Sequence, residues 1–415
     1  MSNTDIKWFT SDNLNAPQLS NNWGVLIDVL DACLVTGLGN LVAASVTAAG
    51  KTVTVNFNSA HGYKQYQVVQ IAGANESEFN TQHRILSVSN TSLTFELSSA
   101  TAHTTASGTI TCKLAPLGFD KAFSGTQKAA YRSKNILKNP YFLRVDNSLD
   151  PAYTTTFAKF GKVGICENMS DIDTMTGHQA PFDTANPTKN WVGTGSGNTV
   201  VNGWAKWYYT KYNSIGLGSP ENLSQTNNDR KWLIVGNESG FLFLPTMTTT
   251  TEPTAALCYG FFANPHVLNT GEIECFLSST VNNNSVSLQQ TYGAITPLCG
   301  QHNFLICLRK YDRTAVNEFA KCLGSLGNFI GNTSGQANTF ASEVNANMLY
   351  FADTAIIDTQ NFVRGKVPFL HWLYQTTTLP SGTVIKKGSD IFIIQDVGGP
   401  SANSNGKIAI KIGEA

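Results

Sequence analysis

Charged side chains are scarce in this chain. Lys, Arg, Asp and Glu make up 13% of its 415 residues, half of the roughly 25% that is usual for soluble proteins. The 28 basic residues balance the 28 acidic ones, whereas a protein that neutralises phosphate groups needs a basic excess on at least one face. The composition therefore argues against nucleic acid or an anionic membrane as the main partner. A weakly charged surface suits a protein that becomes packed in an assembly.

Long apolar runs are absent as well. No stretch approaches the roughly 20 apolar residues that a helix needs to cross a bilayer, so we expect no membrane span. The N-terminus has no basic region followed by an apolar run, so we expect no secretory signal and folding in a cytoplasm. In that reducing compartment the thiols of a long chain are expected to be free and buried. The eight cysteines are Cys33, Cys112, Cys166, Cys258, Cys275, Cys299, Cys307 and Cys322.

The spacings typical of metal, phosphate and nucleophile sites are missing. No Cys-x-x-Cys, His-x-His or His-x-x-x-His occurs, so we predict no metal site and no cofactor. Gly50-Lys51-Thr52 lacks the upstream glycine and the following helix of a P-loop, and is expected to form a hairpin turn. Ser196 is out of register with the Gly-x-Ser-x-Gly pattern. His61 is expected to bond the backbone within a turn.

A close acidic pair in the sequence is Asp171 and Asp173, with Glu167 nearby. Glycan cleavage needs two carboxyl groups that flank the sugar bond. In the short helix expected at 170–174, residues i and i+2 point apart, and acidic residues there are typical of a helix N-terminus. We therefore predict no catalytic residue and a protein that is not an enzyme.

Strand-and-turn chemistry dominates what is present. Short apolar segments alternate with Gly, Asn, Pro and Thr, which indicates a mainly β fold. We expect a multi-domain β-sandwich or barrel architecture with one N-terminal helix and few short helices, at 170–174 and 315–321. The clearest strands of the main part are 141–145, 231–235, 240–244, 257–262, 304–308, 390–394 and 407–411.

The N-terminal helix is expected to begin after a polar cap at Ser20, Asn21 or Asn22. Gly37 and Gly39 should end it. Its apolar residues recur at helical spacing, and they pack either on the main domain or on a neighbouring subunit. The stripe consists of Trp23, Leu26, Ile27, Leu30 and Leu34.

Aromatic residues gather in places that are candidates for subunit interfaces. Residues 1–20 are polar and should form an extended arm with two apolar anchors, Trp8 and Phe9. The run 204–212 is dense enough for a surface that stacks sugars or bases, although a strand buried on both faces, or an edge at a subunit contact, is the ordinary interpretation. The candidate interface residues are Trp8, Phe9, Trp23, Trp204, Trp207 and Tyr208.

The segment 41–113 resembles a known small β-barrel. The likeness lies in Ala60-His61-Gly62-Tyr63, in 69–74, in Phe79-Asn80 and in 92–95. This barrel is known from ubiquitin-activating enzymes and is found more often in structural proteins of tailed bacteriophages. The resemblance implies that a barrel is inserted after the first helix. Insertion of a whole domain is tolerated where its two ends lie together.

The rest of the chain resembles a class of phage and prophage proteins of about 400 residues. The likeness lies in 23–39, 116–133 and 363–370. It implies a virion structural protein and brings no catalytic residues with it. The expected domains are an N-terminal arm and helix (1–40), the inserted barrel (41–113) and a main β-rich domain of one or two subdomains (114–415).

These resemblances and the composition together predict a structural part of a tailed-phage virion, made in the host cytoplasm. Its expected partners are other virion proteins and copies of itself. We expect a peripheral position in the tail, baseplate or neck, with the barrel projecting toward a host surface. The alternatives are a head-surface decoration protein, a tail protein that binds or cleaves host glycans, and a scaffold that is present only during assembly.

Overall fold

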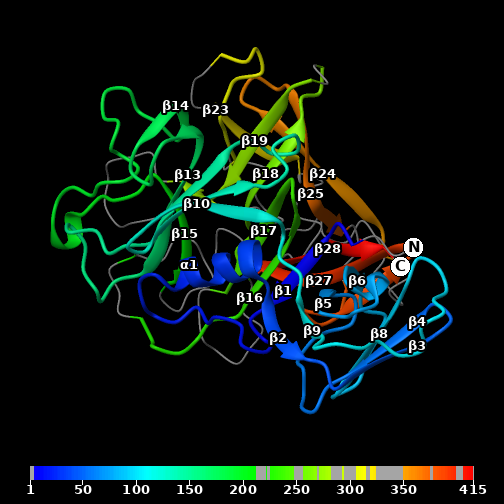
Figure 1. Cartoon of the computed structure of the whole chain (residues 1–415). Coiled ribbons are helices and arrows are strands. Elements are labelled where there is room, and N and C mark those ends of the chain that lie inside the picture. Colours follow the sequence, from blue (N-terminus) through cyan, green and yellow to red (C-terminus); the bar gives the residue numbers. More distant parts are fainter. Residues whose placement is uncertain are drawn as a thin grey trace.

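The computed structural model describes residues 4–211, 221, 225–246, 256–268, 271–281, 292–293, 305–314, 318–323, 349–373, 377–398 and 405–414. These residues form antiparallel sheets and very little helix (Figure 1). The predicted mainly β, multi-domain architecture is confirmed. All seven strands predicted for the main part are present, with ends shifted by up to a few residues.

The largest sheet has twelve strands among the described residues. It folds back on itself, because one apolar core joins Trp8 and Leu242 of its first half to Ile393 and Ile410 of its second half. The first and last strands of the chain consequently lie side by side, as Figure 1 shows. In order across the sheet the strands are β1 (Lys7–Thr10), β16 (Trp232–Asn237), β17 (Gly240–Pro245), β18 (Tyr259–Pro265), β19 (Ile273–Ser278), β22 (Leu305–Cys307), β23 (Glu318–Leu323), β24 (Phe351–Asp358), β25 (Val363–Leu373), β28 (Asn405–Glu414), β27 (Asp390–Gly398) and β26 (Val384–Lys387).

A second sheet of eight strands covers the outer face of β16–β18. Trp207 packs between the two sheets, with its ring 5.7 Å from Phe243 and 6.1 Å from Tyr259. The main part of the chain is thus three sheet layers with two apolar cores. The strands in order are β10 (Phe119–Gly125), β11 (Lys128–Ser133), β12 (Phe142–Asp146), β13 (Lys159–Met169), β15 (Ala205–Thr210), β20 (Thr280–Val281) and β21 (Tyr292–Gly293), with β14 (Met175–Ala180) also paired to β13.

Residues 38–114 form two four-stranded sheets that pack on each other, and we call them the two-sheet unit. Gly50 takes a φ of 63° in the predicted hairpin turn. His61 bonds the backbone as predicted, through Nε2 to the Ser92 carbonyl and through Nδ1 to the Tyr63 amide. One sheet contains β2 (Leu38–Val42), β9 (Thr111–Leu114), β5 (Val68–Ala72) and β6 (Gln82–Arg84). The other contains β3 (Ser45–Ala49), β4 (Thr52–Asn56), β8 (Ser92–Glu96) and β7 (Ser87–Val88).

The two-sheet unit is tied to the rest of the chain by buried polar side chains. Gln67 donates a hydrogen bond to the Trp8 carbonyl, and Asn13 bonds both Gln67 and the Gly62 carbonyl. The two ends of the unit lie together, because Leu38 pairs with Leu114. Its autonomy as an inserted domain with boundaries 41–113 stays a prediction.

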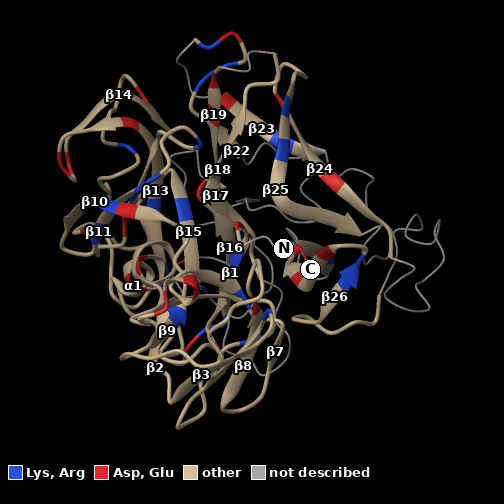
Figure 2. Ribbon diagram, turned by 45° about the vertical axis from the view of Figure 1, so that its right-hand side comes forward, with Lys and Arg blue, Asp and Glu red and all other residues tan. Residues whose placement is uncertain are grey.

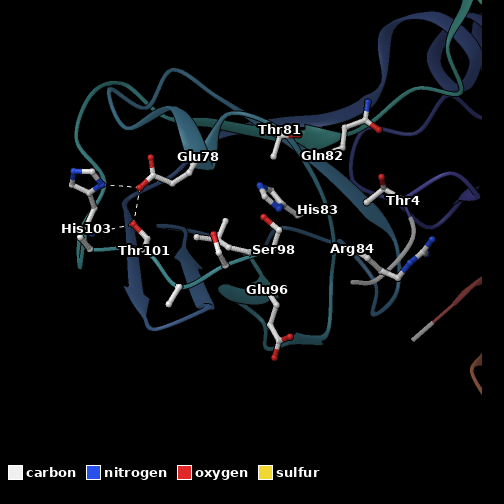
Figure 3. A pocket seen from close by; sticks show the side chains of 14 residues that line it. Thr4, Glu78, Thr81, Gln82, His83, Arg84, Glu96, Ser98, Thr101 and His103 are labelled. Carbon is white, nitrogen blue, oxygen red and sulfur yellow. Dashed lines mark hydrogen bonds and ion pairs between the residues drawn. The ribbon is translucent and has the colours of Figure 1, made fainter.

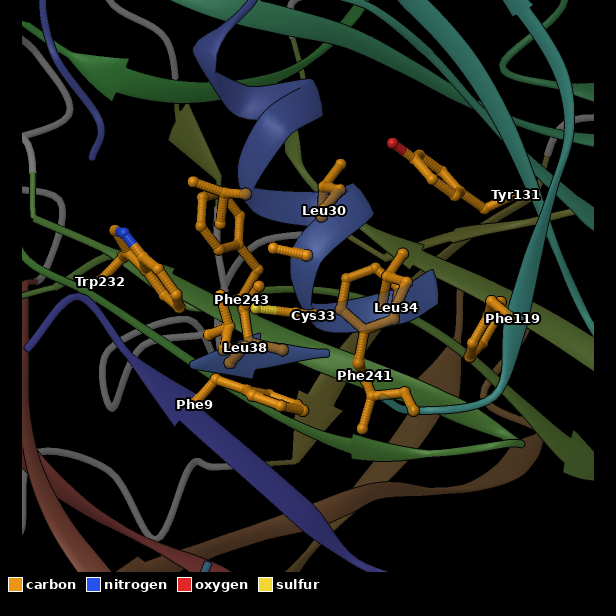
Figure 4. Packing of buried hydrophobic residues seen from close by; sticks show 14 of the residues in the cluster. Phe9, Leu30, Cys33, Leu34, Leu38, Phe119, Tyr131, Trp232, Phe241 and Phe243 are labelled. Carbon is orange, nitrogen blue, oxygen red and sulfur yellow. The ribbon is translucent and has the colours of Figure 1, made fainter. Parts of the chain in front are cut away.

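The predicted N-terminal helix is present as α1 (Val25–Leu30) followed by a π-helical turn, η1 (Asp31–Thr36), which ends at Gly37 with a φ of 84°. Its apolar stripe packs in the core between the sheets (Figure 4). The expected cap is wrong, since Ser20, Asn21 and Asn22 make no cap bond. Instead, the Asn147 side-chain oxygen accepts hydrogen bonds from the Gly24 and Leu26 amides, at 2.9 and 3.2 Å.

Three local predictions are corrected. The described part of the expected arm, residues 4–20, is docked on the large sheet, because β1 pairs with β16 and places Trp8 opposite Val235. The segment 170–174 is a turn rather than a helix, held by the Asp171 carboxylate, which accepts bonds from the Asp173 and Thr174 amides. The second expected short helix lies partly outside the described residues, and its described part belongs to strand β23.

Candidate functional site

The candidate interface residues lie mainly inside this chain. Trp8, Phe9, Trp207 and Tyr208 are buried, and so is Trp204. Strand β15 is buried on both faces, which is the ordinary interpretation of the aromatic run. The indole of Trp23 is half-buried, with its ring edge-on to Phe160 at 5.5 Å. These side chains therefore support intrachain packing, and the apolar surface that remains for partners lies elsewhere.

Several exposed apolar side chains lie where hairpins of the large sheet turn, while others, such as Leu137 at 84%, lie elsewhere. Val267 and Leu268 follow β18, Phe362 precedes β25 and Val363 begins it; their exposed fractions are 47%, 74%, 43% and 51%. Tyr311, from the turn after β22, stacks on Phe362 at 4.3 Å between ring centroids. The three turns meet at the top of Figure 1. We call these five residues the hairpin-end surface.

The buried His266 side chain connects the turns that carry the hairpin-end surface. The His266 ring lies 5.2 Å from the Tyr311 ring, and its Nδ1 accepts a hydrogen bond from the Leu268 amide. Ion pairs border the patch, including Arg313 with Glu272. An apolar centre with a charged rim is the usual anatomy of a protein–protein interface.

A polar groove of about 590 Å³ opens on the two-sheet unit, beside β6 and the segment after β8 (Figure 3). Its floor contains the buried His83 ring, which stacks on Phe95 at 3.9 Å. Burial lowers the pKa of His83, so its ring is neutral at pH 7. Hydroxyl, amide and carboxylate groups line the walls: Thr4, Glu78, Thr81, Gln82, Glu96, Ser98, Ser99 and Thr101.

Glu78 is a charged group of the groove that two neighbouring side chains hold in place. Its Oε1 accepts hydrogen bonds from the Thr101 hydroxyl at 2.6 Å and from the His103 ring at 2.7 Å. These bonds hold the pKa of Glu78 at about 2. A carboxyl group that stays ionised can accept hydrogen bonds from a ligand, but it cannot serve as the general acid that glycan cleavage requires.

The acidic residues singled out in the sequence are held by basic partners or turn amides. Asp173 pairs with Lys128 at 2.8 Å and with the buried Arg144 at 2.6 Å, and these bonds lower its pKa. Glu167 pairs with Arg309. Hydrogen bonds in the 170–174 turn lower the pKa of Asp171. The three carboxylates thus contribute to structure.

A row of buried charged side chains crosses the eight-stranded sheet. No sequence motif predicted this row. Asp146, Lys162 and Lys206 lie opposite one another on β12, β13 and β15. Lys162 Nζ lies 3.5 Å from Asp146 and 3.4 Å from Asp150. Figure 2 shows these basic positions on β13 and β15 against a ribbon that is mostly uncharged.

The row ends at Glu221, whose carboxylate is buried. Lys206 Nζ donates to Glu221 Oε1 at 2.9 Å and to Asn202 Oδ1 at 3.2 Å. The Tyr153 hydroxyl donates to Glu221 Oε2 at 3.3 Å, and the Tyr208 hydroxyl also bonds Glu221. Buried charges of this kind persist only when they are paired and hydrogen-bonded.

Seven cysteines are free and buried, as predicted, and Cys299 lies outside the described residues. Among the residues that the structure describes, no group of three His, Cys, Asp or Glu side chains is arranged to hold a metal ion. No helix in the described part of the chain has the length and apolarity to span a bilayer.

Comparisons with known proteins add little to the structural observations. No family model and no curated protein matches the sequence. Among solved structures, the phage phi92 endosialidase is similar at a TM-score of 0.15 and 10% identity, over 91% of this chain and 52% of that one. The chain therefore spans about half the length of that structure. At this TM-score the likeness supports no conclusion about fold or activity.

Proposed function

We propose that this chain is a non-enzymatic structural component of a tailed-phage virion that assembles through protein–protein contacts. The resemblance of 23–39, 116–133 and 363–370 to phage structural proteins supports this role, as does the low share of charged residues. We place it peripherally in the tail, baseplate or neck. A head-surface decoration protein is the alternative within the same class.

The hairpin-end surface is the observation that carries this proposal. It exposes Leu268 and Val363 beside the stacked Tyr311–Phe362 pair. Apolar contacts of this kind gain free energy when a neighbouring protein removes them from water. We therefore propose that a neighbouring virion protein, a second copy of this chain among the candidates, covers this surface.

A single substitution tests the surface. Leu268→Asp places a charge at the centre of the patch, and we expect incorporation into purified particles to fall about tenfold or more, because a buried unpaired charge costs well over 1.4 kcal/mol. Val42→Asp is the matched control, since Val42 is 61% exposed in the two-sheet unit, away from the hairpin ends. Equal incorporation of both variants would refute the role of the hairpin-end surface.

The groove of the two-sheet unit favours a second candidate function, the binding of an uncharged, hydroxyl-rich ligand such as a host glycan. Its walls offer hydrogen-bond donors and acceptors, and both acidic and basic side chains line it, so that no single sign of charge dominates. The ionised Glu78 favours binding over cleavage. Binding to an array of neutral glycans by the wild type, and its loss in Glu78→Gln and Gln82→Ala but not in Lys51→Ala, would support it. The wild type should bind without shortening the glycan chains. Absence of binding, or binding that persists in both groove variants, would refute this second function.

A further inference from the structure

Asn202, Lys206 and Glu221 form a buried arrangement that the proposed function does not use. Lys206 Nζ lies 3.2 Å from Asn202 Oδ1 and 2.9 Å from Glu221 Oε1. The exposed fractions of Lys206, Asn202 and Glu221 are 3%, 2% and 1%. From this geometry we propose that Lys206 and Asn202 join in an intramolecular isopeptide bond, with Glu221 carrying the proton.

Burial favours the neutral, nucleophilic amine of Lys206, because it lowers the pKa of this lysine. Lys162 lies directly opposite it on β13 and disfavours a second positive charge. The Glu221 carboxylate and the Phe160 ring, whose centroid is 4.4 Å from Nζ, act in the opposite direction and stabilise the ammonium. A desolvated lysine of this kind is a typical protein nucleophile.

Asn202 presents an amide whose leaving group is unrestrained. Its Nδ2 is buried and has no hydrogen-bond partner among the described residues. Such an orphaned polar atom is uncommon in folded proteins and calls for an explanation. Loss of Nδ2 as ammonia would remove it from the core.

Gly203 makes room for the lysine to reach its neighbour. It takes a φ of 71°, and a Cβ there would lie 2.9 Å from Lys206 Cε and 3.0 Å from Lys162 Cγ. Any other residue would therefore collide with the two lysine stems. The turn before β15 thus places Nζ 3.2 Å from Oδ1 of the amide whose Cγ it would attack.

The reaction balances without a co-reactant. Lys206 first passes one proton to the Glu221 carboxylate, and the lone pair of neutral Nζ then attacks Cγ of Asn202. The Nζ–Cγ bond forms and the Cγ–Nδ2 bond breaks. Nζ gives up one further proton by way of Glu221 to Nδ2, which leaves as ammonia. The products are a secondary amide and one molecule of ammonia.

Mass spectrometry of the full-length chain tests the bond directly. We expect an intact mass one ammonia below the sequence mass. Trypsin needs a free lysine ammonium, so the unfolded protein should resist cleavage after Lys206 and release the peptide 190–211 uncut. A full sequence mass together with normal cleavage after Lys206 would overturn the proposal.

Two variants distinguish the isopeptide bond from a succinimide at Asn202-Gly203. Formation of a succinimide also releases ammonia and would give the same mass loss. Lys206→Met keeps a long apolar stem and should restore the full mass, whereas a succinimide would persist and would overturn the proposal. Glu221→Gln retains both reacting groups and should also restore the full mass; a cross-link that survives it would refute the proton-carrying role. If either variant fails to fold, the peptide map of the wild type decides by itself.

Discussion

The guanidinium of Arg84, on β6 of the two-sheet unit, donates a hydrogen bond of 3.0 Å to the Ile412 carbonyl on the C-terminal strand, 328 residues along the chain. The same guanidinium donates to the Ile6 carbonyl at 3.0 Å and to the Tyr66 carbonyl at 2.8 Å. One buried side chain thus fastens together the start of the chain, its end and the two-sheet unit.

Arg84→Ala should destabilise the protein by about 2–4 kcal/mol, because it leaves buried carbonyls without donors and opens a cavity. Lys51→Ala, at the exposed hairpin turn of the same unit, should change the free energy of unfolding by less than about 0.5 kcal/mol. Urea denaturation of both variants measures the difference. An Arg84→Ala protein as stable as Lys51→Ala would show that this link contributes nothing.

Deletion of 41–113 tests the proposed domain boundaries. We expect a folded product, because Leu38 and Leu114 pair and a short linker can join the cut ends. We also expect a lower Tm than that of the full chain, since the contacts of Gln67 and Arg84 are lost. Circular dichroism and thermal melting provide the measurement. Failure of the shortened chain to fold would contradict the insertion of an autonomous unit.

Asn147→Ala should cost about 2–3 kcal/mol of stability. The substitution removes the cap of α1 and two buried bonds, from Nδ2 to the Phe160 carbonyl and to the Tyr209 hydroxyl. Asn22→Ala is the control, because Asn22 was an expected cap from the sequence but is exposed and makes no cap bond. A larger loss in Asn22→Ala, measured by urea denaturation, would contradict the capping role of Asn147.

Stability should fall as the pH rises above about 8.5, the ordinary pKa of an unfolded thiol. Burial raises the pKa of five thiols, so the folded state keeps protons that the unfolded state loses, at up to about 1.4 kcal/mol per pH unit for each thiol. These are Cys33, Cys112, Cys166, Cys275 and Cys307.

Four lysines oppose this trend. Burial lowers the pKa of Lys7 and Lys206, and it lowers the pKa of Lys159 and Lys211 to about 8, so the unfolded state binds more protons below the ordinary lysine pKa of about 10.4, and their contribution to stability rises there. Burial also raises the pKa of tyrosines such as Tyr209 and Tyr259, which adds to the effect of the five thiols toward pH 10, and the net effect should be a loss. Urea denaturation under reducing conditions at pH 8, 9 and 10 checks this. A free energy of unfolding that rises over this range would contradict it.

The strands were predictable because each is a short apolar run bounded by turn residues, as in 231–235 and 240–244 before β16 and β17. The helix was predictable from its apolar spacing and from Gly37. Local patterns of this kind record which side chains are buried. They do not record which distant segment buries them.

The errors share that cause. Trp8 and Phe9 belong to a strand whose partner, β16, comes far later in the chain, so the segment has no local signal of pairing. The helix cap comes from Asn147, 123 residues from Gly24. The groove and the lysine row likewise combine residues from separate strands, such as Lys162 and Lys206. The sequence indicates this row of buried charges only through single lysines that interrupt otherwise apolar strands.

The central claim is that this chain is built into a particle. Quantitative mass spectrometry of purified, infectious particles released from cells that carry its gene tests this most directly. The account predicts that the chain is present at a fixed number of copies per particle and is retained through density-gradient purification. A chain that is abundant during infection, remains a monomer and is missing from finished particles would contradict the account.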